Sequence, residues 1–411
     1  MKEPTGGIRI VSLDQFRGYT VAGMMLVNFI GGFVHAHPVL RHHNTYFSYA
    51  DTIMPAFHFA VGFALRLTLL KRLQTVGKRV AYQHVIHRCL GLILLSTVLE
   101  AATWGHRFNT WSELGQTGVW GLVAGPLKCE FWETLAIIGI TSLWVLPAIA
   151  AGVRARVLFL LGGMALHLVL AQLFYFDFMY ARPNPLDRFW GAATVKGLDG
   201  GPLGFLMWAV PQLAGSLAYD AVAAGWRWPA FARVLGWGLI LSVVGYGLSG
   251  LAMLYPATQP PAQNEGSIQI AESPVLPLRE SQGARDPLAL VPPPPFVQPA
   301  ASEQRQLNYW LMCKRMVTPS YVFCATGFCL IVNACFMLLC DLGSVRIGIF
   351  RTLGQNALAA YIIHEVVAKA VQVFAPADSP VWWMWSAFAV FCWITYLFVR
   401  HLEKSGIYLR L

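Results

Sequence analysis

The sequence predicts an all-α protein, a polytopic bundle of about ten membrane-spanning helices with both termini in the cytoplasm. Two observations predict this class. Of the 411 residues, 56% are hydrophobic and only 12% are charged, against about 25% charged residues in soluble domains. The apolar residues also form long runs, and about 20 consecutive apolar residues cross a bilayer as a helix. A membrane β-barrel is excluded, because its strands alternate apolar and polar residues.

The spans are expected where apolar runs are uninterrupted, and the links between them set the orientation. The links on one side carry most of the lysine and arginine, for example Lys71, Arg72, Lys78 and Arg79 between the second and third spans, whereas Arg41 is alone between the first two. Positive links stay in the cytoplasm, so both termini are expected there. The ten spans are expected at 17–34, 52–70, 86–104, 132–150, 157–176, 204–222, 234–256, 319–341, 352–374 and 382–400.

A proline-rich link divides the chain. Residues 1–256 hold seven expected spans, and residues 319–411 hold three. Residues 257–318 between them include TQPPAQ and LVPPPPFVQP. Such sequence favours extended or disordered chain, so we expect a flexible outer loop and no second soluble domain. The outer link 177–203, rich in aromatic and turn residues, is expected to line the mouth of a site.

Charge and cysteine usage exclude other classes of partner. The formal net charge is +10, but the positive residues lie at span ends, where they set topology, so we expect no nucleic-acid partner. The eight cysteines include no CxxC pair or Cys/His spacing typical of a metal site, and no metal is expected. Cys129 and Cys313 fall in outer links, where free thiols are favoured over a disulfide.

The first outer link, 35–51, carries most of the proton-handling chemistry. Residues 42–55 read HHNTYFSYADTIMP. Asp51 follows His42 and His43 closely, and an aspartate can fix the tautomer and orientation of a histidine. Asp51 is equally suited to cap the second span. His58, two helical turns further on, is expected to be a packed core residue.

The first span has polar residues at both ends. Asp14 and Arg17 lie at its cytoplasmic start, in SLDQFRG. Arg17 is suited to bind a phosphate there, and the alternative is an interfacial anchor. Asn28 lies near the outer end, where a buried asparagine often joins two helices.

The ninth span contains a second polar group, in LGQNALAAYIIHEVV (353–367). Asn356, Tyr361, His364 and Glu365 are costly inside a bilayer and therefore indicate a function. His364 is expected in the outer half, at the depth of Asn28 and the first link. Two distant regions of the sequence are thus expected to converge on one site.

Four stretches together resemble a known family: SLDQFRG with MMLVN, YADTIMPAFHFAVG, TPSYVFCATG and LGQNALAAYIIHE. This set resembles the heparan-α-glucosaminide N-acetyltransferase family and its bacterial relatives. The resemblance implies a polytopic enzyme that uses cytosolic acetyl-CoA to acetylate an amino sugar across the membrane, with an essential histidine in the first outer link. It places family residues at Asn28, Asp51, Asn356, His364 and Glu365, and the histidine at His42 or His43.

The expected function is therefore an integral-membrane acyltransferase of the bacterial plasma membrane. His42 or His43 would act as base or acyl carrier, together with Asp51 and Asn28. The acyl group or the acceptor would be positioned by Asn356, His364 and Glu365. The acyl-CoA would be bound by Arg17 and Asp14. The acceptor would be an amino sugar or another glycan, the protein would contact the bilayer, and a homodimer is compatible with the class. The intramembrane polar residues equally suit a proton-coupled transporter, and a purely structural membrane protein is the third alternative.

Overall fold

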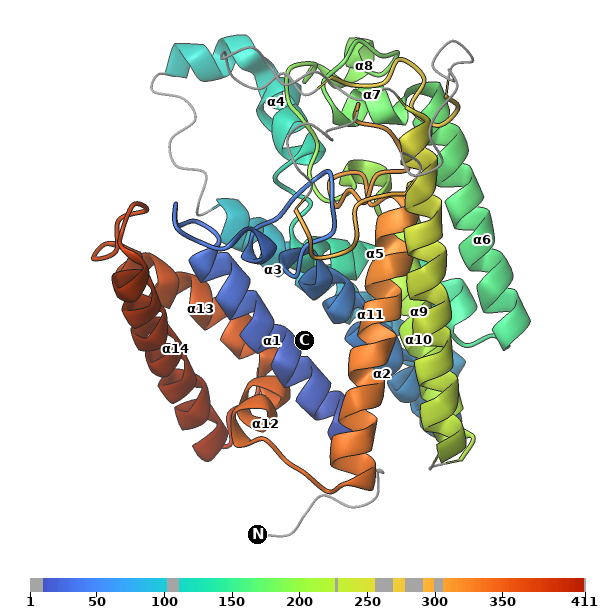
Figure 1. The fold of residues 1–411 in the computed structure, drawn as a ribbon, viewed down its shortest axis with the longest axis vertical. Coiled ribbons are helices and arrows are strands. Elements are labelled where there is room, and N and C mark those ends of the chain that lie inside the picture. Colours follow the sequence, from blue (N-terminus) through green and yellow to red (C-terminus); the bar gives the residue numbers. More distant parts are fainter. Residues whose placement is uncertain are drawn as a thin grey trace.

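The computed structural model describes residues 10–101, 111–225, 228–255, 269–277, 291–298 and 306–409. Within these ranges the regular secondary structure is helical, apart from one isolated β-bridge between Ile270 and Leu307. The expected all-α class is therefore confirmed for the described residues. The α-helices in Figure 1 are α1 (Val11–Ile30), α2 (Ile53–Thr75), α3 (Lys78–Ala101), α4 (Trp111–Lys128), α5 (Thr134–Ile149), α6 (Val153–Leu170), α7 (Phe176–Met179), α8 (Asp187–Trp190), α9 (Phe205–Ala223), α10 (Trp228–Ser249), α11 (Pro319–Phe336), α12 (Gly348–Gln355), α13 (Ala357–Gln372) and α14 (Val381–Lys404).

Six helical segments of the described residues are long and apolar enough to cross a membrane. They support an integral membrane protein. Helices α1, α5, α9 and the α12–α13 pair occupy the other four segments where spans are expected. The count of about ten spans and the cytoplasmic position of the termini stay predictions. The six segments are Ala50–Thr75, Lys78–Ala101, Val153–Met179, Trp228–Leu254, Pro319–Leu342 and Val381–Lys404.

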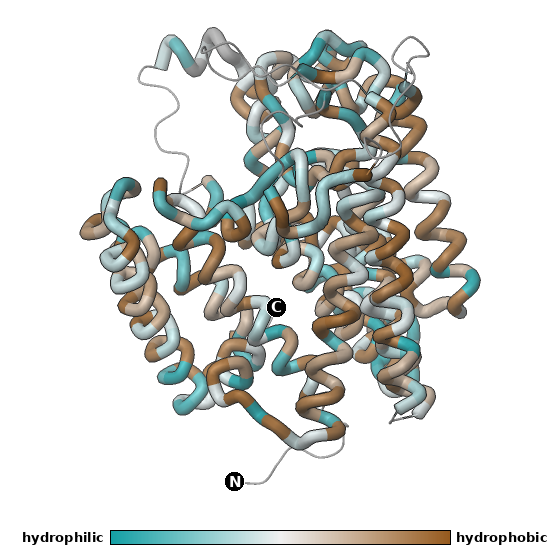
Figure 2. Tube along the Cα trace, in the orientation of Figure 1, coloured by the Kyte–Doolittle hydropathy of each residue, from teal (hydrophilic) through white to brown (hydrophobic). Residues whose placement is uncertain are grey.

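The spanning segments divide into central and peripheral helices. The most apolar window is 67% buried in the α2 segment and 61% buried in the α11 segment, whereas it is 22% buried or less in the segments of α3, α6, α10 and α14. Apolar side chains on the peripheral helices stay exposed, for example Leu94, Leu158 and Val243. A membrane protein covers such side chains with lipid. Figure 2 shows hydrophobic residues along the helices.

Two features differ from the expected elements. Residues 105–131 were expected to be a link, but Trp111–Lys128 forms α4, with a kink at Gly118, where φ is +66°. The ninth expected span is broken in two, because α12 ends at Gln355 and α13 begins at Ala357. Asn356 between them has φ −123° and ψ 44°, and its side chain bonds to the segment that follows α14.

Close helix crossings depend on glycine. A Cβ atom at Gly18 of α1 would lie 1.8 Å from the carbonyl oxygen of Phe350 in α12, and one at Gly354 would lie 2.0 Å from the carbonyl oxygen of Asp14. No larger residue fits at such a distance, and small residues are the usual solution where membrane helices approach closely. The crossing sets the start of α1 beside the α12–α13 break.

A cluster of charged side chains joins four helices at the end of α2. The guanidinium of Arg66 donates to Asp220 of α9 at 2.9 and 3.1 Å and to the carbonyl oxygens of Ile149 and Ala151 at 2.6 and 3.0 Å. Arg156 of α6 donates to the same carboxylate. Buried charges are tolerated when they are paired and hydrogen-bonded, so the cluster fixes α2, α5, α6 and α9 together.

Helix α4 and the short helices α7 and α8 form a cap over the end of the bundle that holds the link 35–51, at the top of Figure 1. We call this the outer end, following the predicted topology. The described parts of the proline-rich link pack here, with Val275, Leu307 and Tyr309 buried against Tyr175 and Phe176. Residues 256–268, 278–290 and 299–305 of the link lie outside the described residues.

Candidate active site

The first outer link folds back on itself between α1 and α2. A short 3₁₀ turn at Pro38–Leu40 is capped by His37, whose Nδ1 accepts from the Val39 amide at 3.2 Å. The Tyr49 amide donates to the carbonyl oxygen of Val39 at 3.0 Å, which closes the loop. The link therefore holds its side chains in a fixed arrangement at the outer end.

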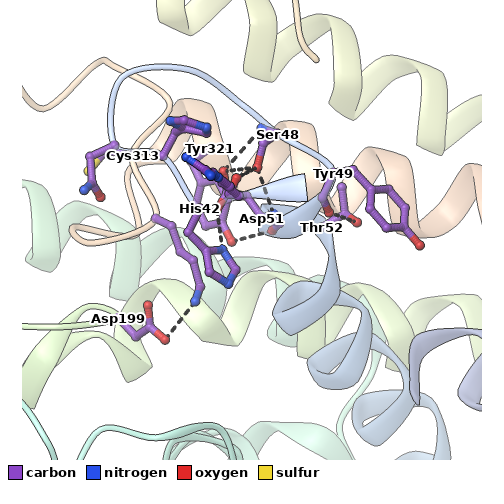
Figure 3. A network of polar contacts seen from close by, with 12 residues as sticks. His42, Ser48, Tyr49, Asp51, Thr52, Asp199, Cys313 and Tyr321 are labelled. Atoms are coloured by element: carbon purple, nitrogen blue, oxygen red, sulfur yellow. Dashed lines mark hydrogen bonds and ion pairs between the residues drawn. The ribbon is translucent and has the colours of Figure 1, made fainter. Parts of the chain in front are cut away.

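Within this loop His42 pairs with Asp51. His42 Nδ1 lies 2.9 Å from Asp51 Oδ1, and the carboxylate is 1% exposed while the His42 side chain is 48% exposed. The amide and hydroxyl of Ser48 donate to Asp51 Oδ2 at 3.2 and 2.8 Å. Figure 3 shows this network. When Nδ1–H of His42 donates a hydrogen bond to Asp51, the imidazole has its lone pair on Nε2, which is the arrangement of a general base.

The neighbouring His43 is engaged elsewhere. Its Nε2 lies 3.0 Å from the carbonyl oxygen of Pro38, and its ring packs on Tyr46 with 4.3 Å between ring centroids. Both contacts lie within the loop and neither involves a carboxylate. The geometry therefore favours His42 over His43, the same order of preference as in the prediction from the sequence.

Asn28 and His364 are brought together, as expected for their common depth. Asn28 Nδ2 lies 3.4 Å from His364 Nε2, and His364 Nδ1 lies 2.5 Å from the carbonyl oxygen of Tyr361. The Tyr361 carbonyl can only accept, so Nδ1 carries the proton and Nε2 accepts from Asn28. Glu365 is half-buried on the adjacent side of α13 and takes no part in this contact.

The other predicted site residues lie towards the opposite end. Asp14 and Arg17 lie in the first turns of α1 and line a cavity of about 1070 Å³. Asn356 is 1% exposed and bonds to the backbone of Ile407 and Leu409. Asn356 is therefore not grouped with Asn28 and His364.

The cavity extends from the start of α1 to the start of α5. At one end it is lined by Arg17, at the start of α1, and by Arg72, in the last turn of α2. At the other end it reaches Thr134, where α5 begins below the cap. Between them lie Tyr361 and several apolar side chains. Further cationic or titratable side chains in the wall are His84, His87 and Arg88.

A buried ion pair lies between this cavity and the His42–Asp51 pair. Lys314 Nζ lies 3.0 Å from Asp199 Oδ2, and their side chains are 14% and 8% exposed. Burial lowers the pKa of the Lys314 ammonium, but the carboxylates of Asp199, Asp51 and Glu133 raise it, and the net shift is upward. Glu133 precedes Thr134 of the cavity wall. In the view of Figure 3, His42 lies between Asp51 and Asp199.

The two loops that carry this ion pair are joined and strained. The Gly200 amide donates to the Arg315 carbonyl at 2.8 Å, and the Arg315 guanidinium donates to the Gly197 carbonyl at 2.8 Å. Asp199 and Val317 both have positive φ, 47° and 51°. Such a backbone conformation costs a residue other than glycine about 1–3 kcal/mol of conformational free energy. Residues in such conformations occur often at functional sites.

The loop that carries Lys314 and the first turn of α11, which follows it, both touch the first outer link or the turn after it. The Tyr321 hydroxyl donates to the Asp51 carbonyl at 2.8 Å, and Cys313 Sγ lies 3.5 Å from Asn44 Oδ1. Cys313 and Cys129 are both free thiols, as favoured from the sequence. Sequence reasoning missed Lys314 and Asp199, although the link 177–203 was expected to line a site and TPSYVFCATG adjoins Lys314.

One further histidine lies in the core. His58 is 0% exposed, with its ring stacked on Trp208 at 4.9 Å between centroids and its Nδ1 3.5 Å from Gln212 Oε1. It is a packed core histidine, as expected.

Among the residues that the structure describes, no group of three or more His, Cys, Asp or Glu side chains is placed to hold a metal ion.

Residues 9–187 match the family model described as heparan-alpha-glucosaminide N-acetyltransferase, catalytic. Residues 9–187 of the 411 are therefore similar to the catalytic domain of the heparan-α-glucosaminide N-acetyltransferase family. The resemblance expected from the sequence is thereby confirmed. A search of curated proteins gave no match.

The match to the acetyltransferase catalytic domain indicates a membrane acetyltransferase enzyme. The matched residues of the N-acetyltransferase-like domain include Arg17, Asn28, His42 and Asp51. His364 and the Lys314–Asp199 pair follow the matched residues in the sequence. In the structure they lie at the same end of the bundle as Asn28 and His42.

Proposed function

We propose that the protein transfers an acetyl or other acyl group from acyl-CoA, bound from the cytoplasm, to an amino sugar or another glycan acceptor at the outer side of the membrane. The observation that carries the proposal is the His42–Asp51 pair, 2.9 Å apart and held in the folded outer link. The pair supplies a base at the outer end of the bundle, and a large cavity with Arg17 and Arg72 in its wall reaches Thr134 at the start of α5. The bacterial plasma membrane is the proposed location.

The cavity suits the donor. Its volume of about 1070 Å³ lies at the upper end of the range for small-molecule sites, about 300–1,000 Å³. The guanidinium groups of Arg17, Arg72 and Arg88 in its wall are suited to phosphate oxygens. Its apolar middle suits a pantetheine arm, which would carry the thioester towards Thr134 and the outer link.

The transfer needs a base for the acceptor. In direct transfer, Nε2 of His42 takes the proton of the acceptor amine or hydroxyl as its nitrogen or oxygen attacks the thioester carbonyl. The resulting tetrahedral intermediate expels the CoA thiolate by breaking the C–S bond, and the thiolate takes up the proton from the imidazolium. Asp51 stabilises the imidazolium in between. The products are the acylated acceptor and CoA thiol.

A covalent route uses the same geometry. Nε2 of His42 attacks the thioester carbonyl, the C–S bond breaks, and the acyl group stays on the imidazole until the acceptor removes it. Asn28 is suited to donate to the acyl oxygen, because its amide is oriented by His364. Either route requires His42, and the covalent route alone leaves the acyl group on the protein.

The test uses purified protein and acetyl-CoA labelled in the acetyl group, without acceptor. Label on the wild-type protein that is lost in His42→Ala and retained in His43→Ala would establish the covalent route and the assignment of His42. His43→Ala is the matched control, because His43 is adjacent and has no carboxylate contact. Equal activity of His42→Ala and the wild type would contradict the role of His42.

Donor binding separates the enzyme from a transporter. The melting temperature of the detergent-solubilised protein should rise with acetyl-CoA, since a ligand that binds only the folded state stabilises it. An unchanged melting temperature, together with no release of CoA, would favour the proton-coupled transporter, whose intramembrane polar contact would be Asn28–His364.

A further inference from the structure

The chain turns back into the bundle after α14. The helix ends at Lys404, and Gly406 adopts φ of +69°, a left-handed conformation that glycine accepts readily. The amides of Ser405, Gly406 and Ile407 donate to carbonyl oxygens of the last turn at 3.0, 3.1 and 2.9 Å, as at many helix C-termini. The segment Ile407–Leu409, which we call the return segment, therefore has a fixed direction.

Asn356 holds the return segment in place. Its Nδ2 donates to the Ile407 carbonyl at 3.0 Å, and its Oδ1 accepts from the Leu409 amide at 3.2 Å. The amide group of this buried side chain thus bonds to the backbone on both sides of Tyr408. Asn356 lies in the break between α12 and α13.

A second contact fixes the end of α14 against α12. Glu403 is 6% exposed and accepts from the Thr352 hydroxyl at 2.7 Å and from the Arg400 guanidinium at 2.5 Å. A buried carboxylate with two hydrogen-bond donors is held firmly. Asn356 therefore holds the return segment itself, and Glu403 holds the end of α14 that precedes it.

The anchored segment is part of the cavity wall. Tyr408 and Leu409 line the cavity, as do Asp14, Arg17 and Gln355 from the same end. Tyr408 keeps 36% of its surface exposed. An aromatic side chain thus stands in the wall that also holds the Arg17 guanidinium.

We propose that the return segment forms the nucleotide end of the donor site, and that Tyr408 stacks on the purine base of CoA while Arg17 binds phosphate. The inference rests on the proposed function, since it takes acyl-CoA as the donor. An aromatic ring beside a cation is the combination that binds a nucleotide, because every base offers a face for stacking. Asn356 is then a positioning residue, which acts on the donor through the backbone of the segment.

The experiment compares two donors in Tyr408→Ala, Tyr408→Phe and Asn356→Ala. Acetyl-CoA carries the nucleotide, and S-acetylpantetheine lacks it. Tyr408→Ala and Asn356→Ala should raise KM for acetyl-CoA about tenfold, within the range for loss of one stacked base, and leave kcat unchanged. KM for S-acetylpantetheine should not change, and Tyr408→Phe should resemble the wild type. Tyr396→Ala is the matched control, because Tyr396 is a half-buried tyrosine of α14 outside the cavity wall.

The outcomes are distinguishable. Tyr408→Ala with an unchanged KM for acetyl-CoA, or with an equal rise for both donors, overturns the assignment and leaves the acyltransferase intact. A wild-type protein that releases thiol from neither donor overturns the proposed function and this inference with it. Should Asn356→Ala fail to fold, the contrast between Tyr408→Ala and Tyr408→Phe decides the question alone.

Discussion

Asn28 Nδ2 and His364 Nε2 lie 3.4 Å apart although 336 positions separate the two residues in the chain. The contact joins the outer half of α1 to α13. His364 is 2% exposed, and its Nδ1–H donates a hydrogen bond to the Tyr361 carbonyl oxygen. The tautomer is fixed by that bond, so the ring presents only an acceptor to Asn28, and the Asn28 amide is held in one orientation.

This relationship predicts non-additive effects. We expect Asn28→Ala and His364→Ala each to lower acetyl transfer about tenfold, because each leaves the other without its partner. The double variant should be no slower than the slower single variant, since residues in one hydrogen-bond network act as a unit. Initial rates of CoA release from the four proteins form the double-mutant cycle. A double variant slower by the product of the two single losses would show that the residues act independently.

Asp51 should matter more than any other neighbour of His42. Asp51→Asn keeps the shape of the side chain, but its amide can donate to Nδ1 and so favours the wrong tautomer. We expect kcat to fall by up to about 10⁴-fold, the loss caused by the equivalent change in an Asp–His pair. Ser48→Ala is the matched control, because it removes a donor to the same carboxylate and leaves the contact between Asp51 and His42 in place. Comparable losses in both variants would show that the loop fold, and not the tautomer, is what matters.

The cationic end of the cavity should govern donor affinity. Arg17→Gln and Arg72→Gln should each raise KM for acetyl-CoA by about ten- to a hundredfold, the equivalent of one hydrogen bond to a charged group, with little change in kcat. The wild-type KM should also rise with salt, since phosphate contacts are screened. Arg154→Gln is the control, because Arg154 is exposed and lies outside the cavity wall. Equal KM values in all three variants would place the donor elsewhere.

Local sequence pattern predicted most of the helices and part of the site. Apolar runs located the long helices, because a spanning helix must be apolar along its length. The spacing of His42 and Asp51 indicated their pairing, since a short link leaves few ways to arrange them. The depth of Asn28 and His364 followed from counting residues along two helices.

Features that depend on distant partners were not predictable in this way. At the break between α12 and α13, the Asn356 side chain makes hydrogen bonds to Ile407 and Leu409, about fifty positions later in the chain. The hydropathy pattern of a sequence gives no sign of such bonds. Lys314 and Asp199 are 115 positions apart and lie in links, where no periodicity shows which side chains face inwards. Their pairing follows only from how the cap folds over the bundle.

The buried Lys314–Asp199 pair gives the last prediction, which concerns stability. Lys314→Met removes the cation and leaves the Asp199 carboxylate, 8% exposed, without its partner. Removing one member of a buried pair costs about 3–5 kcal/mol of unfolding free energy, so the melting temperature in detergent should fall clearly. Asp199→Leu in the same protein removes the unpaired charge, and the double variant should recover most of the loss. Arg188→Met, at a more exposed position of the cap, should change the melting temperature little. A double variant as unstable as Lys314→Met would show that packing of the two strained loops, and not the charge pair, holds the cap on the outer link.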